Sequence, residues 1–184
     1  VFIVAKILRI RIIFRGEAVL KGNEHSKNWK QWLKRFLLPK FLNKCDCVLY
    51  SCTGNEEYWK FFGVEDKKMF PLPCAVDNEF FQKERKKYNV KEIKKELGIK
   101  ENDLVILFSA RFTVRKRPLD LLESLVEIEN KNIVVIFVGD GTEKQKLKNF
   151  AKKNNIRTIF TGFVGQTSIS KFYSVSDIHI VISE

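Results

Sequence analysis

The sequence has few prolines and no long uninterrupted apolar run. Four prolines in 184 residues, beside 45% hydrophobic residues, argue against a disordered chain and leave enough apolar side chains for a real core. No apolar run reaches the roughly 18 residues that a membrane-spanning helix needs. The basic residues near the start are not followed by a signal-peptide cleavage pattern. We therefore expect a cytoplasmic protein.

Metal-binding patterns are also missing. The chain has four cysteines and two histidines, namely Cys45, Cys47, Cys52, Cys74, His25 and His179. The first two cysteines form a Cys-x-Cys, and no second pair follows at the spacing of a zinc site. We expect no metal site and no cofactor, and we interpret the cysteines as buried free thiols in a reducing compartment.

Acidic residues are too few to balance the basic ones, 22 against 34, which gives a net charge of +12. Such a chain attracts polyanions: nucleic acid, an anionic membrane or a phosphate-bearing substrate. Solvated lysine faces are the simplest explanation of the charge. The basic residues form no single block, and no nucleic-acid-binding motif is recognisable. We expect no nucleic-acid partner, although a basic nucleic-acid-binding protein remains an alternative function.

The first part of the chain shows strands and helices in alternation. The expected elements are a buried strand at 11–14, a helix at 27–43, a strand at 46–51, a helix at 55–62 and an extended segment at 69–73. In the helix at 27–43, an apolar stripe repeats at helical spacing among lysines: Trp29, Trp32, Leu33, Phe36 and Leu37. Pro39 should kink this helix or end it early. The stripe suits either docking on its own sheet or peripheral contact with the inner face of a membrane.

The second part is more regular. A short helix within 83–100 precedes strands at 104–108, 133–138, 158–161 and 178–182, and helices at 117–129, 143–153 and 168–175 lie between them. Strands that are apolar on both faces and alternate with helices predict a parallel sheet covered on each side. The fold class is α/β, and we expect one doubly wound domain at 73–184 and the end of a similar lobe at 1–72.

Ligands of open parallel sheets bind where the strands end. After the strand at 104–108 come Arg111 and Lys116, two cations near a helix start that could clamp a phosphate or diphosphate, or belong to a solvated basic loop. Gly139 and Gly141 follow the next strand and fit either a ligand-lining loop or a tight turn. Phe163, after the third strand, could lie near a nucleobase or in the core.

These pieces, in this order, resemble glycosyltransferase family four, the retaining enzymes of the GT-B fold with two Rossmann-like lobes. The resemblance covers nearly the whole chain. The matching segments are Ala110-Arg111-Phe112 through Lys116, Val138-Gly139-Asp140-Gly141, Gly162-Phe163-Val164, Ser176-Asp177, Ile182-Ser183 and the passage from Gly63-Val64 to Phe80-Phe81.

The resemblance implies a hexosyltransferase of cell-envelope polysaccharide biosynthesis. It would move a sugar, without a metal, from a UDP- or GDP-linked donor to a glycan, lipid-linked or small-molecule acceptor. Arg111 and Lys116 would hold the diphosphate as catalytic residues, Gly139 and Gly141 would line the donor pocket, and the backbone near Phe163 and Val164 would contact the nucleobase. Another GT-B enzyme, an epimerase or a phosphorylase, is a further alternative.

Two departures from the family pattern stand out. Where relatives place a His after the first-lobe strand, this chain has Arg15, Gly16 and Glu17, which are candidates for acceptor-side contact or for a solvated turn. The family's pair of glutamates would begin just past Glu184, and its N-terminal glycine loop would lie upstream. We therefore expect a first lobe that is only partly present and a fragment that is inactive by itself.

Overall fold

The computed structural model describes residues 2–20, 28–129 and 132–183, and the chain divides into two compact units, 1–76 and 77–184. The predicted boundary between the lobes, after residue 72, lies four residues before this division. The units are described separately below, and both are built from parallel strands and helices.

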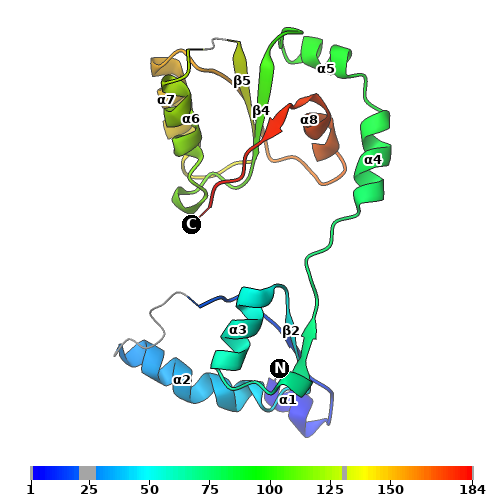
Figure 1. The fold of residues 1–184 in the computed structure, drawn as a ribbon, viewed down its shortest axis with the longest axis vertical. Coiled ribbons are helices and arrows are strands. Elements are labelled where there is room, and N and C mark those ends of the chain that lie inside the picture. Colours follow the sequence, from blue (N-terminus) through cyan, green and yellow to red (C-terminus); the bar gives the residue numbers. More distant parts are fainter. Residues whose placement is uncertain (1, 21–27, 130–131, 184) are drawn as a thin grey trace. The chain divides into compact units, whose positions relative to one another are not determined.

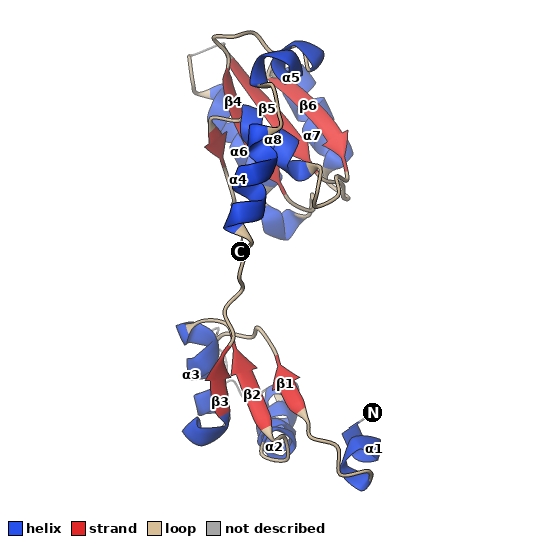
Figure 2. Ribbon diagram, turned by 90° about the vertical axis from the view of Figure 1, so that its right-hand side faces the viewer, coloured by secondary structure: helices blue, strands red, loops and turns tan. Residues whose placement is uncertain are grey.

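The first unit holds a three-stranded parallel sheet in the order β1-β2-β3 (Figure 2). Its elements are α1 (Phe2–Ile7), β1 (Ile13–Arg15), α2 (Trp29–Leu42), β2 (Cys47–Tyr50), α3 (Thr53–Phe61), a 3₁₀ turn (Asp66–Lys68) and β3 (Met69–Pro71). One apolar cluster joins the end of α2, the middle of β2 and the inner side of α3 through Leu42, Val48 and Trp59. All three side chains are buried.

The second unit is a doubly wound layer structure. Its elements are α4 (Asn78–Lys86), α5 (Val90–Glu96), β4 (Leu104–Ser109), a 3₁₀ turn (Val114–Lys116), α6 (Pro118–Val126), β5 (Ile133–Val138), α7 (Lys144–Lys153), β6 (Arg157–Gly162), α8 (Ile169–Val175) and β7 (Ile178–His179). The four strands are parallel in the order β6-β5-β4-β7. Helices α6 and α7 cover one face, and α5 and α8 cover the other (Figure 1).

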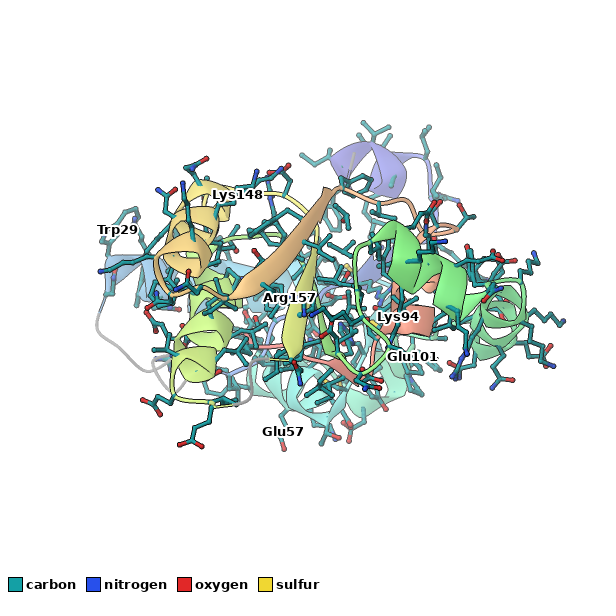
Figure 3. All side chains as sticks on the ribbon, turned by 90° about the horizontal axis from the view of Figure 1, so that it is seen from above. Trp29, Glu57, Lys94, Glu101, Lys148 and Arg157 are labelled. Atoms are coloured by element: carbon teal, nitrogen blue, oxygen red, sulfur yellow. The ribbon has the colours of Figure 1, made fainter. Side chains whose placement is uncertain are left out.

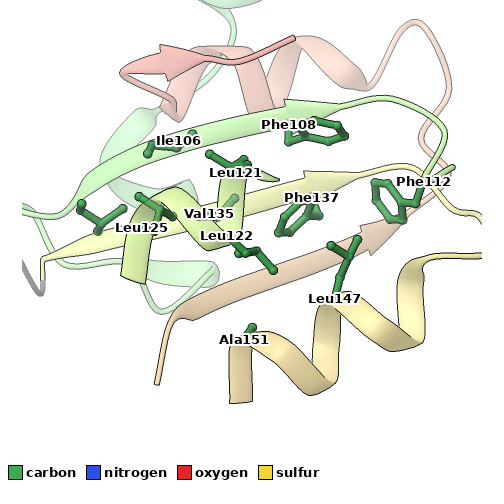
Figure 4. Close-up of a cluster of buried hydrophobic side chains, with 11 residues drawn as sticks. Ile106, Phe108, Phe112, Leu121, Leu122, Leu125, Val135, Phe137, Leu147 and Ala151 are labelled. Carbon is green, nitrogen blue, oxygen red and sulfur yellow. The ribbon is translucent and has the colours of Figure 1, made fainter. Parts of the chain in front are cut away.

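Successive side chains of a β-strand point to opposite faces of the sheet, so apolar residues at every position require helices on both faces. Phe108 and Phe137 pack under α6 and α7 with Phe112 and Leu122 (Figure 4). The alternate residues of the same strands, such as Leu107, face α8 on the other side. Parallel strands buried on both faces must be apolar at every position, so the continuous apolar runs correctly predicted this sheet.

Several predicted bounds were wrong. The buried strand predicted at 11–14 is β1, the edge strand of its sheet, and Ile13 is 65% exposed. Successive side chains alternate between the faces, so Phe14 packs against the apolar cluster while Ile13 points to the other face. The strand predicted at 178–182 is β7, whose pairing with β4 covers two residues. The short helix predicted within 83–100 is confirmed as α5, but α4, which begins at Asn78 after the cap Asp77, was not predicted.

The helix predicted at 27–43 also differs. It is observed as α2, and Lys27 lies outside the described residues. Pro39 does not end it early: the helix continues to Leu42, and the carbonyl of Pro39 accepts a hydrogen bond from Asn43 N. Proline removes one N–H from the ladder but leaves its own carbonyl available. Helix α1 was not predicted at all.

Candidate functional site

The loops that follow β4, β5 and β6 surround a pocket of about 610 Å³ at the carboxyl edge of the second sheet. Its walls are formed by Ser109, Ala110, Arg111, Val138, Gly139, Asp140, Gly141, Phe163, Val164 and Ile169. Five residues singled out from the sequence therefore line one cavity: Arg111, Gly139, Gly141, Phe163 and Val164. Parallel strands bring these positions together because all their carboxyl ends lie at the same edge.

Backbone hydrogen bonds connect the three loops. Ala110 N donates to Val138 O at 3.1 Å, Phe112 N donates to Asp140 O at 3.0 Å, and Gly139 N donates to Gly162 O at 2.8 Å. Beneath them the ring of Phe112 is fully buried between the strands and α7. The pocket wall is therefore a continuation of the sheet and is held by the same kind of bond.

The two glycines of the second loop permit this close approach. A Cβ at Gly139 would lie 2.1 Å from Ala110 O, and one at Gly141 would lie 2.3 Å from Phe112 O. Gly139 also has a φ of +135°, a conformation that side-chain-bearing residues rarely adopt. Each glycine therefore lies against the backbone of the neighbouring loop. Gly139 and Gly141 also line the pocket.

Arg111 is an exposed cation on the pocket wall. Lys116 is half-buried in the 3₁₀ turn before α6 and is not among the residues that line the pocket. Within the described part of the chain, neither side chain is within 4 Å of a carboxylate, whereas neighbouring Arg117 pairs with Asp120. A cation that the fold leaves without a counter-ion beside a cavity can pair with a bound anion.

Asp140 was missed as a site residue, although it stands between the two glycines. Its carboxylate accepts hydrogen bonds from Lys144 Nζ at 2.6 Å and from Gly141 N at 2.8 Å. The bond from Lys144, and then that from Gly141 N, hold the pKa of Asp140 below its usual range. A carboxylate on the pocket wall is thus ionised, and Lys144 compensates its charge.

The aromatic side chain after β6 is not in the core. Phe163 is 87% exposed at the pocket edge, so the alternative that placed it in the core is wrong. Val164 is half-buried and packs against the cluster under α8. The chain therefore anchors this loop through Val164 and presents the ring of Phe163 to solvent.

In the first unit, Arg15, Gly16 and Glu17 follow the end of β1. Arg15 Nη2 donates to Glu17 Oε1 at 3.2 Å and to Cys74 Sγ at 3.4 Å. A Cβ at Gly16 would lie 2.9 Å from the buried indole of Trp59, so this position needs a small residue. Arg15, Glu17 and Cys74 thus form a polar cluster at the carboxyl edge of the first sheet.

The motif residue Asp177 has a structural task. Its carboxylate accepts from Val105 N at 2.8 Å, and its own N–H donates to Val105 O at 2.9 Å. These two bonds align the start of β7 with β4. Ser183 is the last described residue, and Glu184 lies outside the described residues.

All four cysteines are free, as predicted, but only Cys45 is fully buried, and Cys52 and Cys74 are exposed. The expectation of buried thiols was therefore wrong for the latter two, which lie at the carboxyl ends of strands rather than inside the sheet. Across the described residues, no group of three His, Cys, Asp or Glu side chains is arranged to hold a metal ion.

Comparison with known proteins gives a consistent result. The family model described as glycosyl transferases group 1 matches residues 89–184, slightly more than half of the chain. The alpha-monoglucosyldiacylglycerol synthase of Streptococcus pneumoniae is 24% identical over 154 residues, which are 81% of this chain and 35% of that protein. The enzyme of the same name from Acholeplasma laidlawii is 28% identical over 141 residues, 73% of this chain and 35% of that protein.

Among solved structures, HepE of Anabaena in complex with UDP and glucose aligns with a TM-score of 0.75 and 16% identity, over 99% of this chain and 49% of that chain. This likeness, with those to other glycosyltransferases, confirms the predicted GT-B fold class. The chain spans about a third of the length of the curated relatives it matches and about half of this structure.

Proposed function

The chain belongs to the group 1 glycosyl transferases, and on this premise we propose that it carries the donor-binding part of an enzyme that transfers a sugar from a nucleoside diphosphate sugar. The observation that carries the proposal is Arg111, an exposed cation that lines the 610 Å³ pocket and has no carboxylate partner among the described residues. The family match favours sugar transfer over the nucleic-acid-binding alternative.

We assign the pocket residues to parts of the donor. Arg111, assisted by Lys116 from the adjoining turn, binds the diphosphate and offsets the negative charge that grows on it as the glycosidic bond breaks. Gly139 and Gly141 form the wall against the donor. Phe163 and the backbone at Val164 contact the nucleobase, which suits an exposed ring at the pocket edge.

In this proposal the two cations stabilise the leaving group, a task that other enzymes give to a metal ion. The sugar keeps its anomeric configuration, as the resemblance to the retaining family implies. Structures similar to this chain have been solved with UDP and with UDP-glucose, which favours UDP as the nucleotide and a hexose as the transferred sugar.

The acceptor is proposed to bind in the first unit. Arg15 and Glu17 offer a cation and a hydrogen-bond acceptor at the carboxyl edge of its sheet, and Gly16 between them lies against the indole of Trp59. Two curated relatives are named as glycolipid synthases, which favours a lipid-linked acceptor. An enzyme with such an acceptor would be cytoplasmic and peripheral at the membrane, and it would help to build the cell envelope.

Calorimetry with UDP and GDP tests the donor site on the complete protein. We expect Arg111→Ala to weaken binding of the preferred nucleotide about 10- to 100-fold, because a charge-assisted contact to phosphate is lost. Lys116→Ala should weaken it less, because Lys116 is half-buried in the 3₁₀ turn and does not line the pocket.

Arg115→Ala is the matched control, because Arg115 is an exposed cation of the same loop that does not line the pocket. It should leave nucleotide affinity within about twofold of the wild type. Equal binding by wild type and Arg111→Ala would remove the role assigned to this residue.

A further inference from the structure

The apolar core of the first unit meets only one side of α2. Phe41 and Leu42 of this helix join the cluster over the sheet. The predicted stripe lies on the other side and is exposed at each of its positions, Trp29, Trp32, Leu33, Phe36 and Leu37. The alternative in which this stripe docks on its own sheet is therefore wrong, and α3 is the helix that completes the core.

Helix α3 brings one polar side chain into the interior. Asn55, in its first turn, is 0% exposed and is the only buried residue of a polar or charged type among the described residues of the first unit. Glu57, two residues on, is exposed and points away from the helix on its outer side (Figure 3). A buried amide is costly unless its polar atoms are hydrogen-bonded, so the partners of Asn55 indicate what it does.

Both ends of the Asn55 amide are bonded to backbone. Its Oδ1 accepts from Ser51 N at 3.1 Å, and its Nδ2 donates to Ala18 O at 2.7 Å. Ser51 follows β2, and Ala18 follows β1, the neighbouring strand of the sheet. One buried side chain therefore joins the loops that leave the carboxyl ends of two adjacent strands.

The bond to Ala18 closes a short span of chain. Arg15 is the last residue of β1 and is paired with β2. Ala18, three residues later, is tied to Asn55. Only Gly16 and Glu17 lie between these two fixed points. A span of two residues with both ends fixed has few backbone conformations open to it, so the bond at Ala18 determines where the Glu17 carboxylate lies.

The same span orients Arg15. Its Nη2 donates to Glu17 Oε1 at 3.2 Å and to Cys74 Sγ at 3.4 Å. The side chains of Arg15 and Glu17 are 42% and 66% exposed, so both can still contact a ligand. A shift of the backbone at Ala18 would move Glu17, and with it the partner that orients Arg15.

From this arrangement we propose that Asn55 is a positioning residue for the sugar acceptor. It does not touch the acceptor, because it is buried, and it acts by fixing the loop that carries Arg15 and Glu17. The inference rests on the proposed function, which puts the acceptor against these two side chains. Groups that are held in place before binding lose less freedom when a ligand arrives, so a fixed loop strengthens acceptor binding.

Steady-state kinetics of the complete protein test the role of Asn55. The donor is UDP-glucose, and the acceptor probe is dioleoylglycerol in detergent micelles, a lipid with one free hydroxyl. Asn55→Asp keeps an oxygen for Ser51 N but sets its other oxygen against Ala18 O, which repels the loop. We expect it to raise the KM for dioleoylglycerol on the order of 10-fold and to leave the KM for UDP-glucose within about twofold. Asn55→Ser, which keeps a helix-capping oxygen without burying a charge, should do the same.

Val64→Ala is the matched control, because Val64 is buried in the same cluster just past the other end of α3. It should destabilise the unit without moving the loop, so both KM values should stay within about twofold of the wild type. Hydrogen exchange over residues 13–20, followed by mass spectrometry, gives a second readout. Exchange should be faster in the two Asn55 variants than in the wild type and unchanged in Val64→Ala.

An unaltered KM for dioleoylglycerol in both Asn55 variants would overturn the positioning role, and so would an equal rise in Val64→Ala. Glu17→Gln separates the two proposals. If its acceptor KM is unchanged, the acceptor site itself is rejected, whereas a raised KM there with wild-type values in the Asn55 variants rejects only the role of Asn55. If the wild type transfers nothing to dioleoylglycerol, that acceptor is rejected and loop exchange decides: faster exchange in the Asn55 variants supports the role, and equal exchange refutes it.

Discussion

Replacing Gly139 by Ala should destabilise the second unit and distort the pocket. The new Cβ would lie 2.1 Å from Ala110 O, far inside ordinary contact distance, and the φ of +135° is strained for any residue with a side chain. The strain costs about 1–3 kcal/mol. Relieving the overlap by moving the loop costs about another 1–3 kcal/mol. The sum, about 4 kcal/mol, is a large part of the 5–15 kcal/mol that is typical of folded proteins.

Gly162→Ala is the matched control. This glycine also has a positive φ, +75°, and lies beside Gly139 through the hydrogen bond from Gly139 N to Gly162 O, but a Cβ there would meet nothing within 4 Å. Its substitution should cost only the backbone strain, about 1 kcal/mol. The difference between the two variants, about 3 kcal/mol, combines the steric overlap with Ala110 and the greater backbone strain at a φ of +135°.

Urea unfolding followed by circular dichroism measures both free energies of unfolding, and UDP calorimetry measures the pocket. Gly139→Ala should also weaken UDP binding, because the displaced segment carries Arg111. If the two alanine variants unfold within about 0.5 kcal/mol of each other, the overlap relaxes freely and the reasoning about loop contact is refuted.

Two further predictions concern carboxylates of the second unit. Asp103 is buried and accepts from Arg157 Nη1 at 2.7 Å and Lys100 N at 2.7 Å, so Asp103→Asn should lower the free energy of unfolding at pH 7 by about 2 kcal/mol. The bond from Arg157 chiefly lowers the pKa of Asp103, so this contribution to stability is present above the ordinary Asp pKa of about 4 and is lost as pH falls through the lower folded value. Urea unfolding at pH 7 and pH 3 should show that the free energies of unfolding of wild type and Asp103→Asn come closer together in acid. A gap that stays constant with pH would contradict this reasoning. Asp140→Asn removes a negative charge from the pocket wall and should tighten UDP binding by up to about threefold in calorimetry, while weaker binding would mean that the Asp140–Lys144 pair positions the loop.

The regular part of the chain could be predicted because its signals are local. Continuous apolar runs indicated β4 and β5, the charged segments between strands indicated helices, and the parallel arrangement followed from their alternation. Strand ends then located Arg111, Gly139 and Phe163 near one edge of the sheet, and the structure places them on one pocket. No signal of this kind marked α1 or the short extent of β7, because both depend on which neighbours a segment has in space.

By itself, the sequence determined the alternation of apolar strands with helices, and with it a sheet whose carboxyl edge collects the loop residues. Only the tertiary structure decided which side of α2 is covered, since helical spacing shows that a stripe exists and cannot show which of two stripes meets the sheet. It also decided that Gly139 approaches Ala110, that Asp177 holds Val105, and that Asp103 pairs with Arg157, 54 residues away. Each of these depends on a partner remote in sequence, and a remote partner leaves no periodic trace along the chain.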